Sequence, residues 1–125
     1  MTRFELPPPH PSVARIFRRV RMTGGHVDVR PDVVEIDYGW AFHAVIPRSS
    51  IVRVVPDEGP VRRYGANRRD SLWAVAPDHV GLVRLTISPP ASGRLMRIMP
   101  GKIKNLLLAV TDRDGFLKAL GGPSV

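Results

Sequence analysis

The clearest pattern in the chain is an alternation of apolar residues with polar or small ones over residues 34–46. Every even-numbered position in this stretch is apolar: Val34, Ile36, Tyr38, Trp40, Phe42, Ala44 and Ile46. Because successive side chains of a strand point to opposite faces, the stretch predicts one or two strands with a single buried face. Gly39 interrupts it and marks a bend, a bulge or a hairpin turn.

Shorter segments on both sides of this stretch also favour strands. Val27 and Val29 alternate upstream, and a short strand with Ile51 facing inward is expected downstream. Four later segments have the composition of strands and are separated by turn-forming residues: 71–77, 82–88, 94–99 and 103–110. The last of these is apolar at most positions, so we expect it to be buried on both faces.

Two segments have a helical period instead. Near the C-terminus, Phe116, Leu117 and Leu120 share one helical face. Thr111 and Asp114 precede them in a capping pattern, and the glycines that follow end the helix. This segment predicts a short amphipathic C-terminal helix.

The N-terminal segment is ambiguous. Val13, Ile16, Phe17 and Val20 have helical spacing, and Ser12 is a plausible N-cap. The same segment fits a strand by alternation, but we prefer a short helix whose apolar stripe packs on its own domain. Residues 1–12, with the run PPPHP, are expected to be an extended proline-rich arm, either loosely held or recognised by a partner.

Together these elements predict a mainly β domain of about seven antiparallel strands with a C-terminal helix. A chain of 125 residues fits a single domain with its own core. Its longest apolar run has five residues, Leu106–Val110, far short of a membrane-spanning helix. The N-terminus lacks the apolar stretch of a signal peptide. We therefore expect a cytoplasmic protein, either free or peripheral at a membrane.

The charge is strongly positive and unevenly distributed. The net charge is +8, and arginine supplies most of the basic residues. Residues 1–30 and 61–125 are basic, whereas residues 31–60 are acidic. A basic protein attracts nucleic acid or acidic lipid, although a coding bias toward arginine would give the same composition. The uneven distribution also permits charge-matched self-association.

Two segments are candidate sites for an anionic ligand. The first is the basic loop 61–70, where arginine forks, an aromatic ring and a glycine suit phosphate or carboxylate binding. Its candidate residues are Arg62, Arg63, Tyr64, Arg68 and Arg69. The second is the polar side of the N-terminal helix, a candidate membrane or nucleic-acid face formed by Arg15, Arg18 and Arg19.

The sequence contains no motif for catalysis, a cofactor or a metal. The four histidines lack zinc-site spacing, and the chain has no cysteine. The run TDRDG departs from a calcium loop, and neither a nucleophile elbow nor a phosphate-binding loop is present. We expect no catalytic residue, although Tyr38, Trp40 and Trp73 could line a small-ligand pocket or an enzyme site instead of the core.

Three stretches resemble the bacterial PH-like domains, which have a pleckstrin-homology-type barrel. Residues 33–55, VVEIDYGWAFHAVIPRSSIVRVV, are similar to that family's strand, glycine, aromatic strand and I-P-x-x-x-I segment. Segments 72–75 and 82–87 match its next strands in order. LLLAVTDRDGFLKAL, residues 106–120, is similar to its last strand and C-terminal helix. The likeness covers roughly residues 26–121.

The resemblance implies a fold and a class of function. It implies a partly open barrel of two bent sheets packed nearly orthogonally, with the C-terminal helix closing one end. Relatives of this fold bind inositol phosphates or peptides, but the early loops here lack a lysine-rich phosphoinositide pattern. We therefore expect a non-enzymatic binding or scaffold domain that acts through protein contacts or self-association at a sheet edge. Binding of nucleic acid or an acidic membrane is the alternative.

Overall fold

In a computed structural model of the protein, the described residues form nine strands and two α-helices. The structure describes residues 2–21, 24–58, 61, 64–69, 72–96 and 98–121. The elements, which include a 3-10 turn before the fifth strand, have these bounds: β1 Thr2–Glu5, α1 Ala14–Arg19, β2 His26–Val29, β3 Val33–Tyr38, β4 Phe42–Pro47, η1 Arg48–Ser50, β5 Ile51–Pro56, β6 Gly65–Arg69, β7 Leu72–Ala76, β8 Leu82–Leu95, β9 Met99–Ala109 and α2 Arg113–Ala119.

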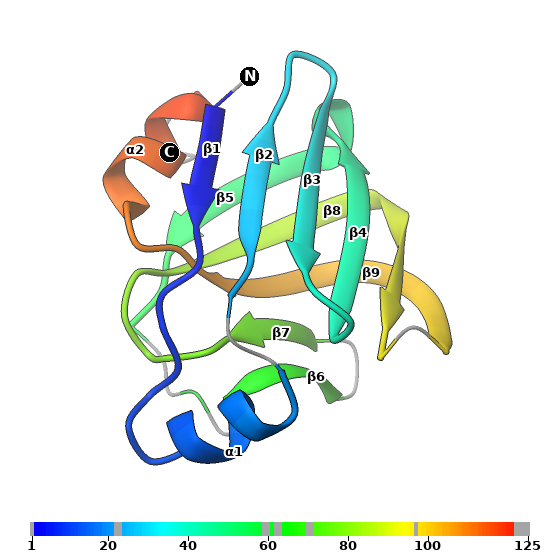
Figure 1. Ribbon diagram of the computed structural model, residues 1–125. Coiled ribbons are helices and arrows are strands. Elements are labelled where there is room, and N and C mark those ends of the chain that lie inside the picture. Colours follow the sequence, from blue (N-terminus) through cyan, green and yellow to red (C-terminus); the bar gives the residue numbers. More distant parts are fainter. Residues whose placement is uncertain are drawn as a thin grey trace.

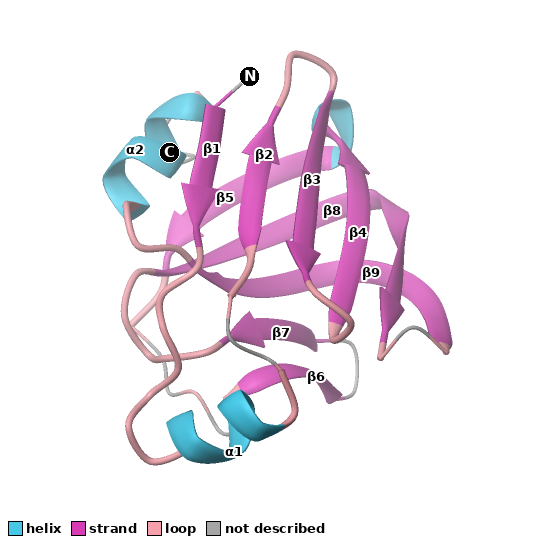
Figure 2. Ribbon diagram, viewed as in Figure 1, coloured by secondary structure: helices cyan, strands magenta, loops and turns pink. Residues whose placement is uncertain are grey.

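The strands form one strongly bent sheet in two layers. Strands β1–β4 stand in front, and β5, β8, β9, β7 and β6 run across behind them (Figures 1 and 2). The strand order is β1-β2-β3-β4-β8-β9-β7-β6, and β5 pairs with β8. Strand β8 joins the layers because its end pairs with β4, Phe42 opposite Leu95, while its beginning pairs with β5. Among the described strands no pairing joins the two ends of the sheet, so the sheet is not closed.

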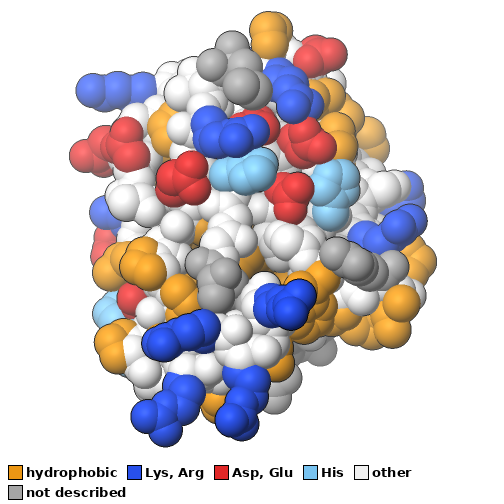
Figure 3. Space-filling view, in the orientation of Figure 1, with side chains coloured by type: hydrophobic (Ala, Val, Ile, Leu, Met, Phe, Trp, Pro, Cys, Tyr) orange, Lys and Arg blue, Asp and Glu red, His pale blue; other side chains and the backbone are white. Residues whose placement is uncertain are grey.

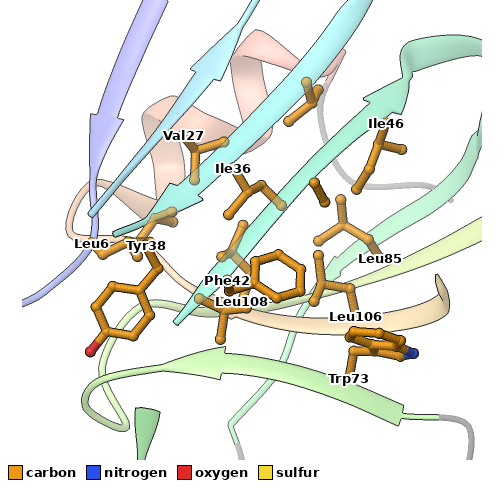
Figure 4. Packing of buried hydrophobic residues seen from close by; sticks show 14 of the residues in the cluster. Leu6, Val27, Ile36, Tyr38, Phe42, Ile46, Trp73, Leu85, Leu106 and Leu108 are labelled. Atoms are coloured by element: carbon orange, nitrogen blue, oxygen red, sulfur yellow. The ribbon is translucent and has the colours of Figure 1, made fainter. Parts of the chain in front are cut away.

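The alternating stretch forms the centre of the core. Strands β3 and β4 pair as a hairpin, and Gly39 takes a left-handed φ of 56° in the turn between them. Their inward side chains are almost completely buried: Val34, Ile36, Tyr38, Phe42, Ala44 and Ile46. Figure 4 shows several of them pointing toward Leu85, Leu106 and Leu108 of the rear layer. The predicted single buried face is therefore confirmed except at Trp40, which lies in the turn and is half-buried.

The end of strand β9 is buried on both faces over Leu106–Ala109, which confirms that part of the prediction, whereas Lys104 is exposed and Asn105 is half-buried. Leu106 and Leu108 belong to the main core between the two layers. Leu107 and Ala109, on the opposite face, pack in a second cluster with Leu82, partly covered by Val61. Val61 and Leu72 thus pack on the outer side of the rear layer.

Helix α2 lies beside β1 and β5 at one end of the sheet (Figure 1). The Phe116 ring meets Phe4 of β1 edge to face with centroids 5.5 Å apart, and Phe116 is fully buried. The predicted apolar face of the helix is thus confirmed. The predicted cap is wrong, because Asp112, not Thr111, accepts a hydrogen bond from the Gly115 amide at 3.0 Å.

Several boundaries also differ from the sequence prediction. The structure has nine strands rather than about seven, and the pairing of β7 with β9 is parallel. Strand β8 continues through the turn predicted at 89–93, with a register shift between Thr86 and Ala91, and β9 includes Pro100-Gly101. Residues 65–69, expected in a loop, form strand β6. Residues 2–5 of the expected arm form strand β1 and pair with β2.

The N-terminal helix exists, but it packs differently from the prediction. Of its predicted apolar stripe, Phe17 is buried and Val13 is half-buried against the core. Ile16 is 62% exposed and Val20 is 43% exposed. Ser12 does not cap the helix, since Val13 is the N-cap residue and Ser12 hydrogen-bonds with His10.

Candidate functional site

Helix α1 carries a basic surface at the end of the molecule away from α2 (Figure 1). We call it the α1 surface and define it by six exposed side chains, four arginines and two aliphatic residues: Arg15, Ile16, Arg18, Arg19, Val20 and Arg21. Three of these arginines are the candidates that the sequence singled out. Lysine and arginine side chains gather over this end of the molecule in Figure 3.

Two anchors hold α1 in place. Phe17 inserts into the core and is 7% exposed. At the C-terminal end of the helix, the Trp40 indole N–H donates to the Val20 carbonyl at 2.8 Å. Trp40 lies in the turn between β3 and β4, so the helix is fixed to the tip of the central hairpin. Because these two contacts hold a helix of only six residues, its three arginines and Ile16 face solvent.

The charges of the α1 surface are not neutralised locally. None of its four arginines forms an ion pair within the described part of the chain, and residues 6–27 contain no Asp or Glu. Each guanidinium therefore presents its donors to solvent. The surface combines unbalanced positive charge with two exposed aliphatic side chains.

The outer face of β1–β4 shows the opposite arrangement. Asp28 is only 2% exposed and accepts two hydrogen bonds from Arg3, at 2.7 and 3.1 Å. Arg30 lies 3.7 Å from Asp28 and 2.8 Å from Glu35, whose other oxygen is 3.1 Å from His43. We call these five residues the paired network.

The paired network shifts the pKa of both its acids. The hydrogen bond from Arg3 holds the pKa of Asp28 below its ordinary value, against the opposing effect of burial. The hydrogen bond with His43, supported by Arg30, likewise lowers the pKa of Glu35. His43 is an exposed histidine on the polar face of β4, with the Glu35 carboxylate beside it.

Only part of the predicted basic loop falls within the described residues. Arg62 and Arg63 lie outside the described residues, as does the side chain of Arg69. Arg68 projects from strand β6 over the Trp73 ring, 5.3 Å from its centroid, in a cation–π arrangement. Tyr64 is half-buried and stacks on His10 instead of offering a free ring.

The three aromatic residues considered as pocket walls have different roles. Tyr38 and Trp73 are buried in the core, and burial raises the pKa of Tyr38 to about 12. Trp40 lines a hollow, about 310 Å³ in volume and open to solvent, with His43 and Arg94 on its rim. Asp37 also lines it, so the hollow has both signs of charge and no single ligand preference.

Sequence reasoning missed a cluster of histidines. His10, from the proline-rich arm, meets Asp78 and His79 in the turn after β7, and Tyr64 lies against both imidazoles. The first histidine stands 69 positions before the last in the sequence, so no local spacing could have indicated the cluster.

Three comparisons with known proteins found no similar protein. No protein-family model matches the chain. Neither the curated proteins nor the solved structures yield a similar protein. Within the part of the chain that the structure describes, no helix has the length and apolar character to cross a bilayer.

Proposed function

We propose that this chain is a non-enzymatic docking domain whose α1 surface binds acidic membranes. The proposal rests on one observation. Four arginines without acidic partners among the described residues lie beside the exposed Ile16 and Val20, on α1 and the two residues that follow it. Arginines attract anionic headgroups, at roughly 1 kcal/mol for each basic residue near the surface. An aliphatic side chain that enters the headgroup region adds about 1.5–3 kcal/mol on full burial.

The aliphatic residues favour a membrane over nucleic acid. A phosphate backbone rewards arginine but offers nothing to Ile16 or Val20, which would stay in water. A helix of six residues is also too short to reach deeply into a DNA groove and read bases. A bilayer uses both kinds of side chain at once, because its charged headgroups lie directly above its acyl chains.

The fold that we propose is the PH-like barrel that the sequence resembles. Support comes from the antiparallel order β1–β4, the crossing second layer and the helix α2 against Phe4. The parallel pair β7–β9 departs from the expected antiparallel pattern. The proposed membrane surface lies on α1, which precedes the region of resemblance, so it does not depend on the family's ligand sites.

Vesicle sedimentation tests the proposal directly. We expect the protein to sediment with vesicles of phosphatidylcholine mixed with phosphatidylserine and to remain in solution with phosphatidylcholine alone. The double variant Arg18→Glu and Arg19→Glu should lower the affinity at least about a hundredfold, since each reversal turns an attraction of about 1 kcal/mol into a repulsion. The matched control is Lys102→Glu with Lys104→Glu on β9, which changes the net charge equally on two exposed residues.

Two outcomes would overturn the proposal. One is equal binding to both kinds of vesicle, or none to either. The other is an equal loss of binding in the α1 variant and the β9 control, which would mean that only net charge matters. Retention on mixed-sequence DNA or RNA, without vesicle binding, would instead assign the arginines to nucleic acid.

The sheet edges favour a second candidate, protein contact or self-association. Among the described strands, β1, β5 and β6 each pair with one neighbour only, which leaves one edge to accept an added strand. Val52 on β5 is 54% exposed. Analytical ultracentrifugation tests this candidate: a mass that rises with concentration supports it, and a monomer throughout the micromolar range contradicts it.

A further inference from the structure

The N-terminal arm and the turn after β7 meet at a cluster of metal-binding side chains. The His10 amide donates to the Pro77 carbonyl at 2.9 Å, which fixes the arm beside this turn. Asp78 and His79 follow directly in the turn. One ligand atom from each of His10, Asp78 and His79 lies within 4.8 Å of the other two.

We propose that His10, Asp78 and His79 bind a divalent transition-metal ion of the zinc class. Two imidazoles and one carboxylate form a donor set that suits zinc, and also copper, nickel or cobalt, better than magnesium or calcium. This site is independent of the α1 surface and of membrane binding.

The distances are compatible with metal binding after a small closure. Zinc–nitrogen bonds of about 2.0–2.1 Å place tetrahedral ligand atoms about 3.3 Å apart. The Nδ1 atom of His79 already lies 2.9 Å from the Asp78 carboxylate. A separation of 4.8 Å must shorten by roughly 1.5 Å, which small side-chain rotations supply, and the His79 side chain has room to rotate because it is 58% exposed.

Neighbouring groups hold the two imidazoles in place. The Tyr64 ring stacks on His10 with centroids 4.6 Å apart and planes 12° apart. The Tyr64 hydroxyl lies 3.3 Å from Nδ1 of His79. Ser12 Oγ lies 2.8 Å from Nδ1 of His10, and the Ser12 amide donates to the same nitrogen at 3.1 Å, so both contacts orient the ring. Such outer contacts fix the ring orientation that a metal ion requires.

The site would also link two distant parts of the chain. His10 stands four residues before α1, and His79 lies between β7 and β8. A bound ion would therefore join the arm that leads into α1 to the rear layer. Ligands recruited across such a sequence separation make binding stabilise the folded state, because the unfolded chain does not preform the site.

Calorimetric titration of Zn²⁺ into the purified full chain tests the proposal. We expect a single saturable site and a rise in melting temperature on adding Zn²⁺. His10→Gln and His79→Gln should each weaken binding at least about tenfold. The matched control is His43→Gln, which removes an exposed histidine that also lies 3.1 Å from a carboxylate. It should leave zinc binding unchanged.

Three results would overturn the proposal. The first is weak, unsaturated binding by the wild-type chain. The second is an equal loss in the His43 control, which would indicate general histidine binding. The third is unchanged affinity in His79→Gln, a variant in an exposed turn that we expect to fold normally. Addition of Co²⁺ gives an independent readout, because bound cobalt in a tetrahedral site absorbs visible light and free cobalt hardly does.

Discussion

The paired network and the α1 surface are both rich in arginine, yet their charges are arranged in opposite ways. In the network, Arg3 and Arg30 contact Asp28 and Glu35 at hydrogen-bonding or ion-pairing distances. On the α1 surface, no arginine has an acidic partner among the described residues. The charges of the network are therefore paired within the molecule, whereas the arginines of the α1 surface face solvent.

This difference shows that arginines in a basic protein can have two roles, one in folding and one in binding. A guanidinium held by a nearly buried carboxylate contributes to folding, since its removal leaves that carboxylate without compensation. An exposed, unpaired guanidinium contributes little to folding and adds self-repulsion. The net charge of +8 alone cannot distinguish the two groups. Substitutions can, because they should change stability in one group and binding in the other.

The largest effect on stability is expected at Asp28. Asp28→Ala should lower the free energy of unfolding by about 2–3 kcal/mol, because it leaves Arg3 and Arg30 without their shared acceptor. Urea denaturation measures the loss. Arg15→Ala on α1 is the comparison and should change the same quantity by less than about 0.5 kcal/mol. Equal losses in the two variants would show that the two surfaces do not differ in this way.

The next largest effect concerns the aliphatic part of the α1 surface. Ile16→Ser should weaken binding to phosphatidylserine-containing vesicles about tenfold, with no loss of stability, because this side chain is already 62% exposed. Val45→Ser is a matched control, since Val45 is 42% exposed on β4, beside the paired network. If both substitutions weaken binding alike, the aliphatic residues of α1 have no special role.

Acid should lower the stability that the paired network contributes before it affects α1. The folded-state pKa values of Asp28 and Glu35 are lowered, so their stabilising effect is complete above the ordinary carboxyl pKa. It is lost as the pH falls through the lower folded-state values, because the unfolded chain binds protons first. We expect the melting temperature to fall as the pH decreases below about 5, and to fall less steeply in Asp28→Asn. An unchanged slope in that variant would contradict the assignment.

The sequence predicted those elements in which apolar residues recur with a regular strand or helix period. The hairpin β3–β4 was evident because three buried residues alternate on each side of the turn at Gly39. Strand β6 was missed because its residues carry no such signal: Ala66 is buried, and the strand forms by pairing with β7. Strand β8 was cut short because prolines and glycine usually indicate a turn, whereas here pairing with β9 resumes at Ala91.

The candidate sites show the same limit. The arginines of α1 were found because they lie close together in the sequence. That Ile16 and Val20 would be exposed was not predictable, since helical spacing indicates a shared face but not whether anything covers it. The histidine cluster depends on the contact of His10 with Pro77, a tertiary feature that single-sequence patterns do not contain.

The smallest effect is expected at a second buried polar group, the Tyr38 hydroxyl. Asp28 is buried with its hydrogen bonds formed, but the Tyr38 oxygen has no hydrogen-bond partner among the described residues. In Figure 4 this hydroxyl points away from the centre of the cluster. Tyr38→Phe keeps the ring in the core and removes a group that forms no bond with the protein.

Tyr38→Phe should therefore change the free energy of unfolding by less than about 1 kcal/mol, and the sign should favour the variant. Thermal and urea denaturation measure this difference against Asp28→Asn, which also replaces one polar group but breaks a formed contact. A loss in Tyr38→Phe as large as in Asp28→Asn would mean that the hydroxyl is paired in solution. The Tyr38 hydroxyl would then resemble Asp28, as a buried polar group whose hydrogen bond stabilises the fold.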